Sequence, residues 1–105
     1  MARSLRFTAF EFDPSKYDAM LLDVNNLDND SLAGISGLSS ARAVRTLENR
    51  MMVMSIYNSI QELDAAADAH RSIFAGIGQY MTGQPLVRSG EIVGVAAGMT
   101  WGPNR

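Results

Sequence analysis

Residues 40–57, SARAVRTLENRMMVMSIY, decide the fold of this chain. Polar and apolar residues alternate over 40–47, Glu48-Asn49-Arg50 favours a tight turn, and 51–57 is rich in residues that favour strands. The pattern predicts a β-hairpin. Side chains alternate between the two faces of a strand. The second strand is therefore apolar on both faces: Met52, Met54 and Ile56 on one, and Met51, Val53 and Tyr57 on the other.

A strand and a helix are predicted before this hairpin. Residues 5–12, LRFTAFEF, are aromatic and β-forming, which indicates a strand. Asp13 is a good helix N-cap, and Pro14 fits the first helical position. The following helix is predicted from apolar residues at helical spacing: Tyr17, Met20, Leu21, Val24 and Leu27. Turn-forming residues at 25–31, NNLDNDS, should end this helix.

A second helix and a last strand are predicted after the hairpin. The helix is indicated by a stripe spaced alternately by three and four residues: Ile60, Leu63, Ala67, His70, Phe74, Ile77 and Met81. We expect it to end near Gly83 and Pro85. Residues 91–98, EIVGVAAG, are predicted to form the last strand, and the residues after them a tail.

The predicted order is β-α-β-β-α-β, which is the ferredoxin-like arrangement of the α+β class. We expect one domain over residues 1–105, with two helices on one face of a four-stranded antiparallel sheet. Two helices cover only one face, yet the 51–57 strand is apolar on both. A second copy of the sheet is the simplest cover, which predicts a homodimer, a dimeric α/β barrel.

Composition narrows the classes of function. Hydrophobic residues make up 47% of the chain and charged residues 19%, which are globular values. A net charge of −2 makes a nucleic-acid partner unlikely on electrostatic grounds. With no cysteine and one histidine, neither disulfides nor a metal site are expected. No apolar run reaches the length of a signal peptide or a membrane span, so we expect no membrane partner and a cytoplasmic location.

Three stretches together are similar to one known family. They are DPSKYDAM (13–20), GISGLSSARAVRTLENRMMVMSIYNS (34–59) and TGQPLVRSGEIV (82–93). They resemble the dimeric α/β-barrel proteins, in particular the antibiotic-biosynthesis-monooxygenase-like group. The resemblance implies a pocket between the sheet and the helices. It also implies oxidation of phenols, anthrones or quinols by molecular oxygen without a cofactor, or, in other relatives, degradation of haem.

The site residues follow from this resemblance and from the helical stripe. Residues 5–12 lack the asparagine that the haem-degrading relatives use, so haem degradation is not expected. The resemblance to cofactor-free oxygenases implies that no cofactor is needed. His70 and Tyr57 are the expected catalytic residues, and Tyr57 stands where the family often has tryptophan. We expect Phe7, Ser55 and Phe74 to bind the substrate, a small aromatic molecule.

Two interpretations of His70 remain open from the sequence. Because it lies in an apolar stripe, its ring should face the sheet, either packed and bonded to a backbone carbonyl or to Tyr57, or exposed to a pocket. In a pocket its unperturbed pKa near 6.5 would let it accept a phenolic proton at neutral pH. The functional hypothesis is a cofactor-independent monooxygenase acting on phenolic or quinol-like aromatics. The alternative is a non-catalytic dimeric ligand-binding or stress-response protein.

Overall fold

The computed structural model describes residues 2–26, 35–97 and 100–103, with side chains as far as Val95. Its elements, in chain order, are β1 (Ser4–Glu11), η1 (Pro14–Lys16), α1 (Tyr17–Asn25), β2 (Leu38–Leu47), β3 (Arg50–Tyr57), α3 (Ile60–Ala65), α4 (Ala67–Ile77), η2 (Gly78–Tyr80), β4 (Leu86–Glu91), β5 (Gly94–Ala97) and β6 (Thr100–Pro103).

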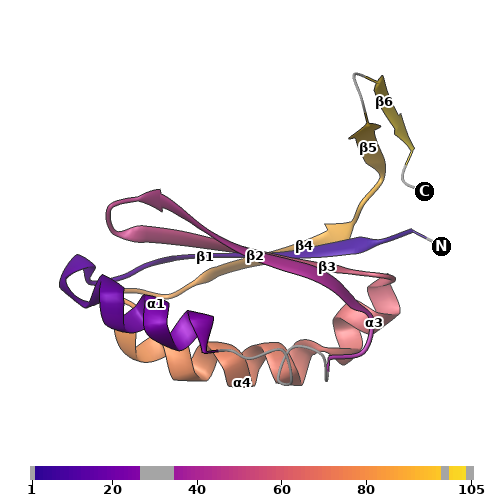
Figure 1. Ribbon diagram of the computed structural model, residues 1–105. Helices are drawn as coiled ribbons and strands as arrows, with labels where there is room; N and C mark the ends of the chain where they lie inside the picture. The colour runs from indigo at the N-terminus through magenta and orange to yellow at the C-terminus, as the bar shows by residue number, and fades with distance from the viewer. Residues whose placement is uncertain (1, 27–34, 98–99, 104–105) are drawn as a thin grey trace.

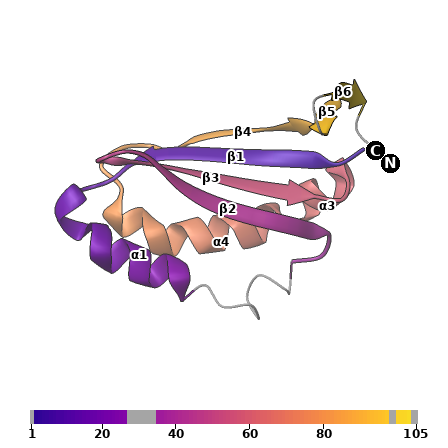
Figure 2. The same cartoon turned by 45° about the horizontal axis from the view of Figure 1, so that its top comes forward.

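Four of the strands form one antiparallel sheet in the order β2-β3-β1-β4. Helices α1, α3 and α4 all lie on the same side of this sheet, as Figure 1 and Figure 2 show. The other face of the sheet carries no helix among the described residues. The predicted β-α-β-β-α-β order and the placing of the helices on one face are therefore confirmed.

The alternation along β1 and β3 gives the sheet two different faces. The buried, helix-facing residues of β1 are Ser4, Arg6, Thr8, Phe10 and, just beyond the strand, Phe12. On β3, Met51, Ser55 and Tyr57 are buried on the same face. The predicted division of the 51–57 strand is confirmed, because Met52, Met54 and Ile56 pair with Ala9, Phe7 and Leu5 on the outer face.

The core lies between the inner face of the sheet and the helices. Its main cluster consists of Phe10, Phe12, Met20, Met51 and Ile77, and a second cluster of Tyr57, Leu63 and Ala66. Burying one large apolar side chain stabilises the fold by about 1.5–3 kcal/mol. The two clusters hold α1, α3 and α4 against the sheet.

Local capping explains where the helical segments begin. The carboxylate of Asp13 accepts a hydrogen bond from the Ser15 amide at 3.0 Å, so the predicted cap is confirmed, although the first turn after Pro14 is a 3₁₀ turn. The Ser59 hydroxyl accepts from the Glu62 amide at 3.2 Å and caps α3. Each cap satisfies a backbone donor that the helix itself leaves free.

The fourth strand is β4, and the prediction of a last strand over residues 91–98 is wrong. Leu86 to Glu91 pair with β1, and the pairing ends at Ser4 with Glu91. A strand that began at Glu91 would run past the end of β1. Residues 94–97 instead pair with 100–103 in a separate two-stranded hairpin. Figure 1 shows this hairpin projecting from the side of the sheet opposite the helices.

The second helix is interrupted and shorter than predicted. It is divided at Ala66 into α3 and α4, and α4 ends at Ile77, followed by a 3₁₀ turn to Tyr80 rather than a helix reaching Gly83. Gly76 and Gly78 explain the early end, because glycine is a poor helix former. The first helix ends at Asn25, and Leu27 with the remainder of the predicted turn lies outside the described residues.

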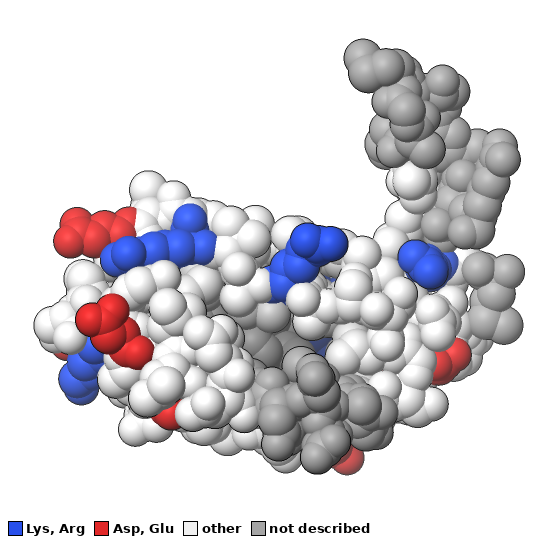
Figure 3. All heavy atoms as spheres, viewed as in Figure 1, with Lys and Arg blue, Asp and Glu red and all other residues white. Residues whose placement is uncertain are grey.

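The charged side chains are spread over the surface. On the face seen in Figure 3, lysine and arginine side chains are separated from one another by uncharged atoms. No described helix is long and apolar enough to cross a membrane.

Candidate functional site

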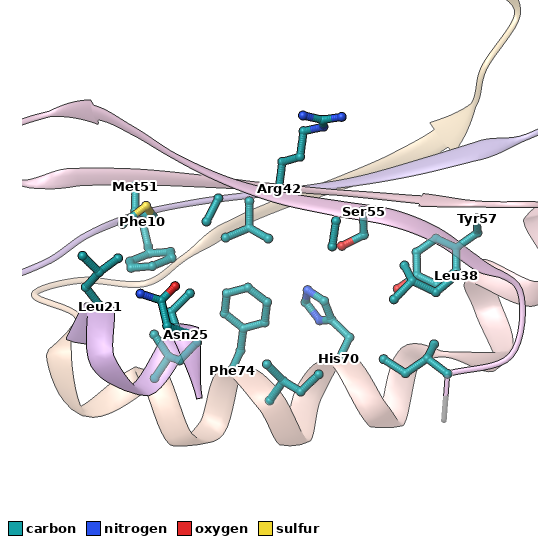
Figure 4. Close-up of a pocket in the computed structure, with 17 residues that line it drawn as sticks. Phe10, Leu21, Asn25, Leu38, Arg42, Met51, Ser55, Tyr57, His70 and Phe74 are labelled. Carbon is teal, nitrogen blue, oxygen red and sulfur yellow. The ribbon is translucent and has the colours of Figure 1, made fainter. Parts of the chain in front are cut away.

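A cavity of about 330 Å³ lies between the inner face of the sheet and helices α1 and α4. Its size is at the lower end of the range for small-molecule sites, about 300–1,000 Å³. It is lined by Phe10, Leu21, Val24, Asn25, Ile35, Leu38, Ala41, Arg42, Ala43, Met51, Val53, Ser55, Tyr57, His70, Ile73, Phe74 and Ile77. Figure 4 shows the Arg42 side chain pointing away from the cavity, to the other face of the sheet.

Aromatic rings form one part of the cavity wall. The His70 and Phe74 rings, one turn apart on α4, have centroids 4.5 Å apart and planes tilted by 36°. Phe10 of β1 meets Phe74 edge to face, with centroids 6.1 Å apart. Figure 4 shows Phe10 reaching down from the sheet and Phe74 and His70 reaching up from α4. Such a wall suits a flat aromatic ligand, because aromatic rings pack favourably edge to face or offset.

His70 enters the cavity from α4 and is hydrogen bonded to the sheet. Its Nε2 lies 3.1 Å from the hydroxyl oxygen of Thr8, and its ring is partly buried. The predicted helix phase is therefore confirmed, because the ring faces the sheet and lines the cavity. The bond to Thr8 is neither of the two packed arrangements expected from the sequence, which were bonds to a backbone carbonyl or to Tyr57.

The surroundings of His70 keep its ring neutral. Burial, with smaller contributions from the positive charges of Arg6 and Arg71, lowers the pKa of His70 from 6.5 to about 4. Burial disfavours the charged imidazolium, and nearby cations repel it. At neutral pH the ring is therefore an unprotonated acceptor or a neutral donor, and not a cation.

The structure brings four of the five predicted site residues to one place. His70, Tyr57, Ser55 and Phe74 all line the cavity. The Ser55 side chain points into it from β3, opposite His70. Phe7 does not reach this cavity: it pairs with Met54 and lies on the outer face, where it borders a separate hollow with Met52 and Leu86.

Sequence reasoning missed Thr8 and Arg6. Both face inward on β1, Thr8 as the partner of His70 and Arg6 as a buried cation only 7% exposed. They share the face of Phe10 and Phe12 on this strand, but the sequence alone does not show that this face, and not the face of Phe7, is turned to the helices. Among the described residues, no group of three His, Cys, Asp or Glu side chains is placed to hold a metal ion.

Comparison with known proteins supports the architecture. No family model matches the sequence, and no curated protein matches it significantly. A solved dimeric ferredoxin-like protein from an uncultured marine organism superposes with a TM-score of 0.76 at 12% identity, covering 92% of this chain and 93% of that one. The chain has the ferredoxin-like fold.

Two further solved structures are similar. A protein of unknown function from Nitrosomonas europaea matches with a TM-score of 0.74 at 13% identity, over 92% of this chain and 95% of that chain. A protein from Caulobacter crescentus CB15, described as a putative antibiotic biosynthesis monooxygenase, matches with a TM-score of 0.71 at 19% identity, over 86% and 89%. At these identities the likeness concerns the ferredoxin-like fold.

Proposed function

We propose that this chain is a small-molecule pocket protein that acts as a cofactor-independent monooxygenase on phenolic or quinol-like aromatics. The observation that carries the proposal is the aromatic-walled cavity with the His70 ring inside it. The similarity in fold to the Caulobacter crescentus protein agrees with this class of activity. His70 and Tyr57 are the proposed catalytic residues, with Ser55 and Phe74 contacting the substrate.

The chemistry begins with removal of a proton from the substrate. The unprotonated ring of His70 accepts the proton of a phenol, or of the CH₂ group of an anthrone, and leaves an electron-rich anion. The anion reacts with molecular oxygen to form a hydroperoxide, which loses water. For an anthrone, the CH₂ group becomes a carbonyl that holds one oxygen atom, and the other oxygen atom leaves as water with the two hydrogens. The substrate supplies all four electrons.

Oxygen uptake by the purified protein tests the activity. We expect an anthrone to be consumed above its autoxidation rate, with one atom of ¹⁸O₂ found in the new carbonyl. His70→Ala should lower the rate by about 10²–10⁴-fold, the usual effect of losing a general base. Tyr57→Phe should have a smaller effect, because it removes one hydroxyl and keeps the ring. No turnover across a panel of anthrones, phenols and quinols, or an unchanged rate in His70→Ala, would contradict the oxygenase.

One observation favours the second candidate, a non-catalytic ligand-binding protein. A histidine whose pKa is lowered to about 4 is a weak base, and its Nε2 is already bonded to Thr8. Saturable binding of aromatic compounds without oxygen uptake would support that function over the oxygenase.

We further propose that the chain forms a homodimer through the outer face of the sheet. One row across this face joins Val44, Met52, Ala9 and Leu86, and the next joins Arg42, Met54, Phe7 and Arg88. The centre is apolar, and Leu86 and Val44 are 47% and 39% exposed. An exposed patch of this kind usually marks an interface.

The occupant that we propose for this face is a second copy of the chain. The β5–β6 hairpin projects on the same side of the sheet, and an isolated two-stranded hairpin is only marginally stable in water. A second copy packed on the outer face would give this hairpin a surface to pack against. The similar marine protein is itself described as dimeric.

A further inference from the structure

Arg6 is a cation buried in the protein interior. It lies on β1, faces the helices and is only 7% exposed. One terminal nitrogen, Nη2, donates to the backbone carbonyl of Leu63 on α3 at 3.0 Å. The guanidinium carbon lies 5.6 Å from the centre of the Tyr57 ring. The carbonyl oxygen and the aromatic ring both interact favourably with the guanidinium. Neither carries a full negative charge that would balance it.

The positive charge of Arg6 has no carboxylate partner among the residues that the structure describes. The ion pairs found there are Arg50 with Glu11 and Arg71 with Asp68, and both lie at the surface. The second terminal nitrogen of Arg6, Nη1, is buried and has no hydrogen-bond acceptor within residues 2–26, 35–97 and 100–103. An arginine stays protonated in proteins, and a buried charge is normally paired because removing it from water is costly. Within the described part of the chain, the charge of Arg6 is therefore not balanced by an anionic side chain.

Two polar residues of the cavity wall lie next to Arg6. Arg6 is directly paired with Ser55 in the sheet, and its guanidinium lies against Tyr57. Both residues line the cavity, and neither hydroxyl is hydrogen bonded to another described protein group. Two hydroxyls that can donate, with a cation behind them, form a suitable environment for a negatively charged oxygen.

We propose that the cavity binds its ligand as an oxygen anion, an ionised phenol or enol, with Arg6 as the counter-charge and Ser55 and Tyr57 as hydrogen-bond donors. The inference rests on the proposed function, because it concerns the same cavity. Arg6 does not need to touch the ligand, since charges interact strongly across a few ångströms of protein interior. It is a positioning and electrostatic residue, and it makes the reactive anion easier to form beside a weakly basic His70.

The ionisation of a bound coloured phenol tests this proposal. 4-Nitrophenol is yellow only when ionised, so its absorbance reports its charge state. We would measure binding and absorbance across the pH range in which it ionises, with the protein in excess. The groups that can contribute charge near the bound oxygen are Arg6 on β1, Tyr57 on β3, and His70 and Arg71 on α4. We expect the pKa of the bound phenol to be lower than that of the free compound by about 1 unit or more, and the anion to bind at least tenfold more tightly.

Variants distinguish the effect of the Arg6 charge on the pKa of the bound phenol from the effect of the other cavity residues. In Arg6→Met the pKa of the bound phenol should rise above that of the free compound, because burial alone disfavours the anion. Arg6→Lys keeps the charge and should keep the lowered value, and Lys16→Met, which removes an exposed charge on η1 away from the cavity and the outer face of the sheet, should behave as the wild type. A raised pKa in the wild-type protein would overturn the inference without any variant, so it remains testable if Arg6→Met does not fold.

The outcomes also distinguish this inference from the proposed function. If 4-nitrophenol and neutral phenols of its size bind in the cavity but ionise no more readily than in water, the inference is overturned and the pocket function stands. If neither binds, both are overturned.

Discussion

The hydroxyl oxygen of Thr8 on β1 lies 3.1 Å from Nε2 of His70 on α4, and this contact joins the sheet to the helix beside the cavity. It holds the only histidine of the chain in a partly buried place, between Phe74 and the sheet. The chemistry open to His70 depends on how readily its ring takes a proton there.

The pKa of His70 can be measured without assignment problems, because the chain has one histidine. We expect the Cε1–H proton signal of the ring to titrate with a midpoint near 4, since burial and the charges of Arg6 and Arg71 disfavour the imidazolium. In Arg6→Met the midpoint should move upward but stay below 6.5, because burial is the larger cause. A midpoint at or above 6.5 in the wild type would show that the ring is solvated and away from the cation.

The stability of the protein should depend on pH through the same residue. The pKa of His70 is about 4 in the folded state and near 6.5 when unfolded. Between these values the unfolded chain binds a proton that the folded chain does not, so the free energy of unfolding should fall as pH falls from 6.5 to 4. Above 6.5 this contribution is fully present.

Urea unfolding of the wild type and His70→Gln, compared pH by pH, isolates this contribution from that of the carboxylates. The difference between the two proteins should change only inside that pH window. A constant difference from pH 8 to pH 4 would contradict the linkage.

The outer face of the sheet can be tested by introducing one charge. Met52 lies in the centre of an apolar row between Val44 and Ala9, so Met52→Glu would leave an unpaired carboxylate in the proposed dimer interface. Sedimentation at micromolar concentration should show twice the chain mass for the wild type and a monomer for the variant. Leu22→Glu makes the same kind of change on α1, where Leu22 is 62% exposed, and should remain dimeric. A wild-type monomer would rule out the dimer.

The cavity can be filled from β2. Ala43 lines it and is the partner of Val53, so Ala43→Phe should occupy ligand space while adding an apolar side chain to an apolar wall. We expect binding of a phenol to weaken by at least about tenfold, that is by 1.4 kcal/mol or more. Isothermal titration calorimetry measures this, with the exposed Ala75→Phe on α4 as the control. Equal affinity in Ala43→Phe and Ala75→Phe would place the ligand elsewhere.

Periodicity was sufficient to predict the parts of the fold that are buried on one face. The alternation in 51–57 correctly predicted which residues of β3 lie on the inner face and which on the outer face. The helical spacing correctly predicted that His70 and Phe74 face the sheet. In both cases burial on one side imposes a regular pattern on the sequence.

The inner and outer faces of β1 could not be distinguished in this way. Phe7 and Phe10 lie on opposite faces, and apolar residues occur on both, so parity alone did not say which residues share the cavity side. Phe7 was therefore expected at the site, while Arg6 and Thr8 were overlooked. An arginine in a strand is ordinarily exposed, and only the three-dimensional structure shows that Arg6 is buried.

The fourth strand was misplaced for a related reason. Its residues are all exposed and include Arg88, Ser89 and Gly90, so it has a weak hydrophobic pattern. The run at 91–98, EIVGVAAG, is more apolar and predicts a strand there. The position of β4 is determined by its pairing with β1. The ends of β1 limit which residues can take part in that pairing.

Occupancy of the cavity beside His70 is tested most directly by the NMR signal of that ring during titration with a phenol or anthrone. We expect the Cε1–H signal of the wild type to shift saturably, because a bound aromatic ring would lie against His70 and Phe74. The shift should be lost in Ala43→Phe and kept in Ala75→Phe. A His70 signal that stays unchanged up to the solubility limit of every compound, in a protein that remains folded, would contradict a ligand site in this cavity.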